Sequence, residues 1–297
     1  MLDLIKYRKW WYILSLVIIL PGTISLFVWG LKPSIDFTGG TQIEYGGTNN
    51  KSTIIAAAKE VKMEDIVVTS NSGGVILRTK TINEDKTKEL NKLVESKISG
   101  SKVIRFDTVG PSISGEITRN AFLLVLAASL VIVMYIAYSF RKVPKPAKSF
   151  EFGIAAIIGL LHDALVLLGV FSLLGHFYGV EVDPLFITAT LTVIGFSVHD
   201  TIVIFDRIRE NLIKGSYKNF EQAATVSVFE MLPRTINTSF LVWAILLVLY
   251  IFGGETTRYF VLALLIGILS GTYSSILNAT PLLVTWENFK IKRRSKV

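Results

Sequence analysis

Six long apolar segments constrain the fold of this 297-residue chain more than any other feature. Each has about the 20 residues that a helix needs to cross the hydrocarbon core of a bilayer. Only 18% of the residues are charged, compared with about 25% in a typical soluble domain. The chain is therefore predicted to be a polytopic α-helical membrane protein with six transmembrane helices. The segments are roughly 10–30, 120–140, 152–174, 185–205, 234–252 and 259–285.

Basic residues beside these segments predict the orientation of the chain. They gather before the first segment and after the second, fourth and sixth, whereas the opposite connections 175–184 and 253–258 contain only Arg258. Because Lys and Arg mark the cytoplasmic side, both termini are expected to be cytoplasmic. The first segment is expected to stay as an uncleaved anchor, since its apolar run is too long for a signal peptide. The basic residues include Lys6, Arg8, Lys9, Arg141, Lys142, Lys148, Arg207, Arg209, Lys214, Lys218, Lys290, Lys292, Arg293 and Arg294.

The same charges argue against a nucleic-acid partner. The net charge is +8, but the basic residues lie where membrane topology signals lie rather than in a patch on a soluble domain. The sequence contains no cysteine, which excludes disulfides and thiolate metal sites.

Residues 31–119 form a polar, lysine-rich segment between the first two spans. Strands are predicted at 41–46, 65–70, 75–82 and 101–109, with a hairpin turn at 71–74. Helices are predicted at 52–61, with Ser52 as the N-cap, and at 83–98. The order βαββαβ is that of the ferredoxin-like, split βαβ fold. We therefore expect an outer α+β domain that handles a partner or a substrate. The expected organisation is 1–30 for the N-terminal cytoplasmic end and first transmembrane helix, 31–119 for the ferredoxin-like domain, 120–288 for a five-helix transmembrane bundle and 289–297 for a basic cytoplasmic tail.

An ionisable residue, Asp200, lies inside the fourth segment, in GFSVHDTIVIFDRIRE. It precedes Asp206, at the end of the apolar run, by about 9 Å of helix. Charges at such a depth are costly and usually mark ion or proton pathways. Arg234, at the start of the fifth segment, is the expected counter-charge, and Ser197 and Thr201 lie on the same side as Asp200. The alternatives are a static salt bridge between helices, or an Arg234 that snorkels to the interface.

Asp163, near the middle of the third segment, is another buried carboxylate. It is either a second relay station or a structural clamp. His162 and His199 each precede an aspartate. Adjacent residues on a helix point about 100° apart, so neither pair is expected to chelate a metal ion. A proton-shuttle role for His199 is left open. The charges that follow Asp206 are expected to anchor the helix and to form ion pairs between helices.

Small residues recur every four positions in the sixth segment, and Gly267, Gly271 and Ser275 are at their centre. Such a face lets helices approach closely in lipid, where hydrophobicity does not drive association. It predicts close helix packing and carries no chemistry.

Several of these stretches together resemble the SecF branch of the SecD/SecF protein-export family, within the resistance-nodulation-division (RND) superfamily. The resemblance covers nearly the whole chain, and the combination of these stretches is specific to the family. Two residues differ from those more common in the family: position 196, here Phe196, is often tyrosine, and position 199, here His199, is often asparagine. The stretches are IDFTGGTQIEY (35–45), VGPSISGEI (109–117), LHDALVLLG (161–169), GFSVHDTIVIFDRIREN (195–211), LPRTINTS (232–239) and GTYSSILNATPLL (271–283).

The resemblance implies a membrane motor without bond-making chemistry and without a cofactor, driven by an H⁺ or Na⁺ gradient. It assigns a proton relay to Asp200 and Arg234, and less firmly to Asp163. It implies a location in the bacterial cytoplasmic membrane and assistance to late steps of preprotein export. The implied partners are a SecD-like subunit, the SecYEG channel with YajC, and an unfolded preprotein on the outer face.

Three other functions stay open at this point. Half of an RND-type small-molecule or lipid exporter would be expected to carry larger outer domains than residues 31–119 provide. An intramembrane aspartyl protease needs two carboxylates that converge on one bond, which the expected Asp200–Arg234 pairing disfavours. A purely structural assembly factor needs no buried charge.

Overall fold

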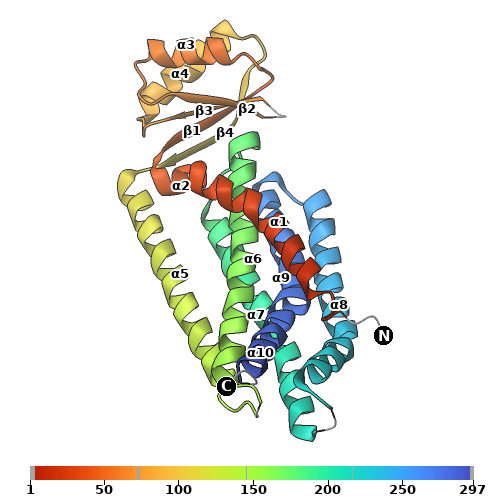
Figure 1. Cartoon of the computed structure of the whole chain (residues 1–297). Coiled ribbons are helices and arrows are strands. Elements are labelled where there is room, and N and C mark those ends of the chain that lie inside the picture. The colour runs from red at the N-terminus through yellow and green to blue at the C-terminus, as the bar shows by residue number, and fades with distance from the viewer. Residues whose placement is uncertain (1–3, 72–73, 145, 216, 295–297) are drawn as a thin grey trace. The chain divides into compact units, whose positions relative to one another are not determined.

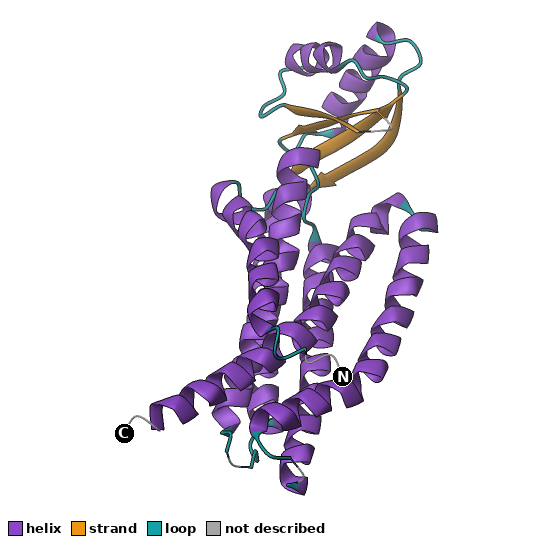
Figure 2. Ribbon diagram, turned by 45° about the vertical axis from the view of Figure 1, so that its right-hand side comes forward, coloured by secondary structure: helices purple, strands orange, loops and turns teal. Residues whose placement is uncertain are grey.

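The computed structural model describes residues 4–71, 74–144, 146–215 and 217–294. The chain divides into two compact units. A helical unit comprises Met1–Leu31, Leu124–Val180 and Leu185–Val297, and an α+β domain comprises Lys32–Leu123 with Glu181–Pro184. Figures 1 and 2 show the long helices of the first unit and the small sheet of the second.

Six helices among the described residues are long and apolar enough to cross a membrane. The prediction of a polytopic helical membrane protein is therefore confirmed. The last of the six contains a π-helical turn, Ser275–Ala279, between α9 and α10. The helices are α1 (Arg8–Val28), α5 (Pro111–Ser139), α6 (Ser149–Tyr178), α7 (Pro184–Lys214), α8 (Phe220–Phe252), α9 (Arg258–Ser274) and α10 (Thr280–Arg294).

The helices extend well beyond the apolar segments, most clearly at α8. The fifth apolar segment was expected to begin near residue 234, but α8 begins at Phe220 and contains Pro233 in its interior. The expectation was wrong because the amphipathic stretch before Pro233 is itself helical. Asn219 caps it by accepting a hydrogen bond from the backbone N–H of Gln222 at 2.8 Å, which satisfies a free donor of the first turn.

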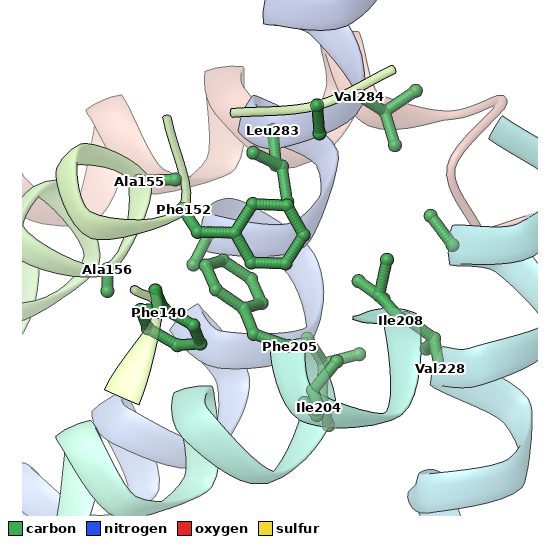
Figure 3. Packing of buried hydrophobic residues seen from close by; sticks show 14 of the residues in the cluster. Phe140, Phe152, Ala155, Ala156, Ile204, Phe205, Ile208, Val228, Leu283 and Val284 are labelled. Carbon is green, nitrogen blue, oxygen red and sulfur yellow. The ribbon is translucent and has the colours of Figure 1, made fainter. Parts of the chain in front are cut away.

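Aromatic rings fill the core of the helical unit. The ring centroids of Phe152 and Phe205 lie 5.2 Å apart, and each lies 5.6 Å from that of Phe140. Aromatic pairs at such distances contribute about 0.5–1.5 kcal/mol beyond their burial. Figure 3 shows the three rings among side chains from α6, α7, α8 and α10. This cluster joins helices that are distant in sequence.

Two glycines set the crossing of α1 and α6. A Cβ atom on Gly22 would lie 2.8 Å from the Cα of Gly169, too close for any side chain. Beside this crossing the hydroxyls of Ser25 and Ser172 are 2.7 Å apart, and Ser172 donates to the carbonyl of Gly30 at 2.7 Å. The sequence indicated small-residue packing in the sixth segment and gave no sign of this second contact.

The α+β domain contains a four-stranded antiparallel sheet in the order β2-β3-β1-β4. The register sets Ile43 opposite Leu77 and Phe106. Ile43 and Leu77 pack with Leu90 and Val94 in a core between the sheet and its two longer helices. The elements are α2 (Ile35–Thr38), β1 (Gly40–Gly46), α3 (Lys51–Glu60), β2 (Val67–Asn71), β3 (Gly74–Thr79), α4 (Glu84–Lys97) and β4 (Lys102–Val109).

The expected strands and helices of this domain are present, but some of their ends differ. β2 begins at Val67, two residues later than expected, and β3 ends at Thr79, three residues earlier. Asn50, and not Ser52, caps α3, since its side chain accepts from the backbone N–H of Thr53 at 3.2 Å. Both residue types cap helices well, so the sequence alone did not separate them. In the expected turn, Ser72 and Gly73 lie outside the described residues.

Candidate functional site

Asp200 lies in the interior of α7, 4% exposed. Ser239 of α8 donates a hydrogen bond from Oγ to Asp200 Oδ2 at 3.5 Å, the long limit for such a contact. A buried carboxylate normally gathers several short hydrogen bonds. Asp200 is therefore a buried acid held loosely by its surroundings.

A second hydroxyl continues from Ser239 to the surface of the helical unit. Thr272 of α9 donates to Ser239 Oγ at 2.7 Å. Both residues line an apolar groove of about 240 Å³ between α8 and α9. The remaining lining side chains are Ile236, Phe240, Trp243, Ile268 and Leu269. A line of hydroxyls thus leads from the surface groove to a buried acid. It passes through Thr272 and Ser239 and ends at Asp200.

Arg234 does not form the expected direct pair with Asp200. Within the described residues no ion pair joins them, and Arg234 is exposed on α8. The charge of Arg234 acts on Asp200 only at longer range. The reason lies in the length of α8: Arg234 precedes Ser239 by five residues, or about 7.5 Å of helix. Ser239, rather than Arg234, is the α8 residue level with Asp200. The direct-contact expectation is corrected, and Arg234 is left on a face available to another element.

Asp163 receives more and shorter hydrogen bonds than Asp200. It is 0% exposed on α6 and receives hydrogen bonds from Ser270 to Oδ1 and from Ser274 to Oδ2, both at 2.7 Å. Ser197 of α7 donates to the same Oδ2, and His162 Nδ1 lies 3.0 Å from Oδ1. Four donors from three helices thus surround one carboxylate.

The imidazole of His162 contacts Asp163 although adjacent residues on a helix point about 100° apart. Rotation about the side-chain torsions brings the imidazole of His162 back onto Asp163 although the Cα–Cβ bonds diverge. His162 also lies 3.5 Å from the hydroxyl of Tyr273 through Nε2. The phenol is hydrogen bonded to Ser15 of α1 and accepts from Asn278 Nδ2 at 3.2 Å.

Ser197 was expected beside Asp200, but it donates to Asp163. The sequence did not identify Ser270, Tyr273 and Ser274 as site residues. Ser270, Tyr273 and Ser274 belong to a single stretch of the sixth segment, at the spacing of one helical turn. Polar residues at that spacing inside an apolar segment are the signal that could have found them.

The other predicted site residues are spread over the helical unit. The Thr201 hydroxyl pairs with that of Ser275 at 2.7 Å, in the contact between α7 and the π-helical turn. A Cβ on Gly267 would lie 2.2 Å from Val193 Cγ2, and one on Gly271 3.0 Å from Ser197 Cβ. The backbone of α9 therefore lies directly against α7. His199 is exposed, on a different face of α7 from Asp200.

Ion pairs tie the helix ends together. Arg207 Nε lies 2.6 Å from Glu230 Oε2 and joins α7 to α8, so the expected inter-helix pair is present. Lys290 of α10 lies 2.7 Å from both Glu151 of α6 and Glu287. Among the residues the structure describes, no group of three His, Asp or Glu side chains is placed to hold a metal ion.

Two sequence families match the chain. The family described as "Protein export membrane protein SecD/SecF, C-terminal" matches residues 88–289, and "SecD/SecF GG Motif" matches residues 24–48. The "Protein translocase subunit SecF" of Thermobaculum terrenum is 45% identical, with 100% of this chain and 98% of the relative covered. That of Anaerolinea thermophila is 38% identical, covering 97% and 95%.

Solved structures of SecDF proteins are also similar to this chain. The crystal structure of "SecDF, a translocon-associated membrane protein," from Thermus thermophilus is 30% identical, with a TM-score of 0.80 over 96% of this chain. SecDF in a "Super-membrane-facing form" is 27% identical, with a TM-score of 0.68 over 99%. This chain spans 38% and 40% of those two chains.

The six long apolar helices, with polar side chains buried among them, define this chain as a multi-pass helical membrane protein. It carries an α+β domain after its first helix. The family match over residues 88–289 and the SecF relatives along the full chain give the narrower class: the chain belongs to the SecD/SecF family of protein-export membrane proteins.

Proposed function

We propose that this protein is an accessory subunit of the Sec protein translocase and couples the proton-motive force to late steps of preprotein export. The relatives over its full length are named translocase subunit SecF. The observation that carries the coupling is Asp200, a buried acid with a long 3.5 Å hydrogen bond at the end of a hydroxyl line from the groove.

The energetics suit this role. One charge that moves through 100 mV releases about 2.3 kcal/mol. At about 1.4 kcal/mol for each factor of ten, this shifts a two-state equilibrium roughly 50-fold. A loosely held acid can take up and release a proton without first breaking a set of strong hydrogen bonds, whereas the four-donor cage of Asp163 resists the same change.

The proposal extends to the location of the chain and to its partners. We place the chain in the bacterial cytoplasmic membrane with both termini in the cytoplasm, in line with its basic residues. The strand order β2-β3-β1-β4 supports a ferredoxin-like fold for the α+β domain, which would meet unfolded preprotein on the outer face. A SecD-like subunit supplies the part of SecDF that this chain does not span, and the assembly acts beside SecYEG and YajC without a cofactor.

Arg234 would be covered by the SecD-like subunit in this assembly. An arginine exposed at the level of an apolar helix face is costly in lipid. It is accommodated when a facing helix of the SecD-like subunit covers α8 and the groove. Arg234 would then stabilise the ionised form of Asp200 from the edge of the site.

The test is proton-dependent export with the SecD-like partner reconstituted in vesicles. Asp200→Asn is expected to abolish the stimulation of preprotein export by an imposed proton gradient and to leave assembly with the partner intact. Asp206→Asn is the matched control, since Asp206 lies on the same helix and is 58% exposed. Stimulation of Asp200→Asn equal to that of the control would rule out the relay.

A further inference from the structure

Part of the connection between α6 and α7 belongs to the α+β domain. α6 ends at Tyr178, and α7 begins at Pro184. Within this connection, Glu181–Pro184 forms a compact unit with the α+β domain, although both helices belong to the helical unit. Pro184 is therefore the last residue of a segment of the domain and the first residue of α7.

Backbone hydrogen bonds hold this segment to the start of the domain. Val182 forms an isolated parallel bridge with Pro33. Its N–H donates to the carbonyl of Lys32 at 2.8 Å, and its carbonyl accepts from the N–H of Ser34 at 2.9 Å. Val182 is buried, so water competes little for these bonds. The segment is thus fixed to the residues that precede α2.

The side chain of Glu181 adds a second attachment, to the sheet. Arg78 of β3 donates from Nη1 to Glu181 Oε1 at 2.8 Å, and Lys32 Nζ lies 3.4 Å from the same oxygen. The side chains of Arg78 and Glu181 are 15% and 23% exposed. An ion pair that is partly removed from water is screened by salt much less than one on the surface. Glu181 therefore ties the start of α7 to a strand.

Arg78 depends on Glu181 for this contact. Nη1 bonds Glu181, and within the described residues Nη2 is buried and has no hydrogen-bond partner. Arginine and carboxylate groups frequently pair through two parallel bonds, and here one of the two is present. Loss of the Glu181 carboxylate would leave both terminal nitrogens of a largely buried guanidinium unpaired. We therefore expect the segment and the sheet to separate when that carboxylate is removed.

The two helices that this segment joins carry the buried aspartates. Asp163 lies on α6 and Asp200 on α7, and no other aspartate among the described residues is buried. Asp200 follows Pro184 by about 24 Å of continuous helix, at a rise of about 1.5 Å per residue. Because the backbone hydrogen bonds of a helix resist extension, a displacement of α7 at Asp200 is carried along the helix to the segment that Glu181 holds.

We infer that Glu181 is a positioning residue that joins α7 to the sheet of the α+β domain, and that movements of α7 reach the domain through it. The attachment stands on contacts within the domain and on the continuity of the chain. Its part in export rests on the proposed function, in which a change at Asp200 drives the movement.

Hydrogen exchange of the full chain in lipid nanodiscs tests the attachment. The amides of Ser34 and Val182 are expected to exchange slowly in the native chain and faster in Glu181→Ala. Glu64→Ala is the matched control, because Glu64 forms an ion pair with Lys80 at 2.8 Å in the same domain, and it should leave both amides slow. Native rates at both amides in Glu181→Ala would overturn the inference.

An exchange of charges separates the ion pair from the general effect of a substitution. The double variant Arg78→Glu with Glu181→Arg keeps the net charge and places opposite charges at the same two positions. It is expected to restore slow exchange of the Val182 amide, whereas Arg78→Glu alone should lose it. Equally fast exchange in the double variant and in Arg78→Glu would contradict a role for the pair.

A pair of spin labels measures the transmission. Because the chain lacks cysteine, Ser96→Cys on α4 and Ile213→Cys on α7, both at exposed side chains, give one label in each unit. Glu181→Ala should broaden the distribution of distances between the labels relative to the native chain, and Glu64→Ala should not. An unchanged distribution in Glu181→Ala would show that α7 reaches the domain by another route and would refute the transmission.

The export assay links the attachment to the proposed function. Glu181→Ala is expected to lose the stimulation of export by a proton gradient, as Asp200→Asn does, and Glu64→Ala to retain it. Full stimulation in Glu181→Ala, beside a loss in Asp200→Asn, would refute the transmission and leave the relay intact. Full stimulation in Asp200→Asn would refute the relay, and the hydrogen-exchange and spin-label results would still decide whether Glu181 joins α7 to the domain.

Discussion

At the scale of single residues, the two buried aspartates differ in how completely they are bound. Asp163 receives four hydrogen bonds, whereas the contact from Ser239 to Asp200 is 3.5 Å long. A fully bonded carboxylate resists change and contributes to stability. A loosely bonded one can change its protonation with little rearrangement of its neighbours.

Removing one donor from the Asp163 cage should therefore reduce stability. Ser270→Ala leaves a buried lone pair of Asp163 unpaired, and such a loss costs about 1–3 kcal/mol. Thermal unfolding of the full chain in detergent, followed by tryptophan fluorescence, measures the change. Ser96→Ala, at an exposed serine of α4, is the control and should leave the midpoint unchanged. Equal midpoints for the two variants would show that the cage contributes nothing.

A buried tyrosine in the α+β domain supports a prediction about pH. Tyr45 is 1% exposed and donates to Asn91 Oδ1 at 2.7 Å. Burial raises the pKa of Tyr45 well above its ordinary value of 10.0. In the unfolded chain Tyr45 loses its proton first, so the stability it contributes is complete below pH 10 and decreases as pH rises further.

Tyr45→Phe should remove that decrease and cost about 1 kcal/mol at neutral pH through the lost hydrogen bond. Urea unfolding of the domain, followed by a fluorophore on a single cysteine at Ser96, gives both quantities. Tyr45 is the one tyrosine between residues 32 and 123, so tyrosine ionisation within this domain is attributable to it. A variant that loses stability above pH 10 as steeply as the native domain would contradict this assignment.

At the scale of helices, the crossing of α1 and α6 depends on the absence of side chains. Gly22→Ala would place a Cβ 2.8 Å from the backbone of Gly169 and push the helices apart. Overpacking of this kind costs about 1–3 kcal/mol. Gly195→Ala on α7 is the matched control, because a Cβ there meets nothing within 4 Å. Thermal unfolding in detergent should show a lower midpoint for Gly22→Ala alone.

The sequence predicted the helices better than their contacts. Apolar runs identify segments that must lie in lipid, and the expected start of the fourth segment, at residue 185, is one residue from the start of α7 at Pro184. Periodicity identified the packing face of the sixth segment because its small residues repeat. The Gly22–Gly169 crossing uses one glycine from each helix, and a single glycine leaves no pattern. The start of α8 was misplaced because its first turns, from Phe220, precede the apolar run by which the segment is recognised.

The site was predicted in part for a similar reason. An aspartate in an apolar segment is conspicuous, so Asp200 and Asp163 stood out. Which hydroxyls surround each of them depends on the rotation of α9 against α6 and α7. Ser239, five residues after Arg234 on α8, is the residue that contacts Asp200. The sequence does not predict the depth of a helix in the membrane to within five residues.

At the scale of the whole molecule, the chain spans 38% of the length of the similar SecDF chain from Thermus thermophilus. Without the remainder, α8 leaves Arg234 and the groove beside Asp200 uncovered. Vesicles that contain this chain and the channel but lack the SecD-like subunit should therefore show no gradient-dependent export. Addition of the subunit should restore it, and stimulation by this chain alone would contradict the need for a partner.

The π-helical turn Ser275–Ala279 has a consequence for how this protein can vary in length. A π turn accommodates one residue more than an α turn, so it behaves as a single-residue insertion that the fold retains. Deleting Leu277 would let the helix close into regular α form and leave the faces of α9 and α10 in register. A deletion in regular helix, between Thr280 and Lys290, would instead rotate everything after it by about 100° and turn Lys290 away from Glu151, 2.7 Å from it in the native chain. A chain one residue shorter in this turn can therefore keep the same contacts, and a one-residue gap in an alignment should fall there.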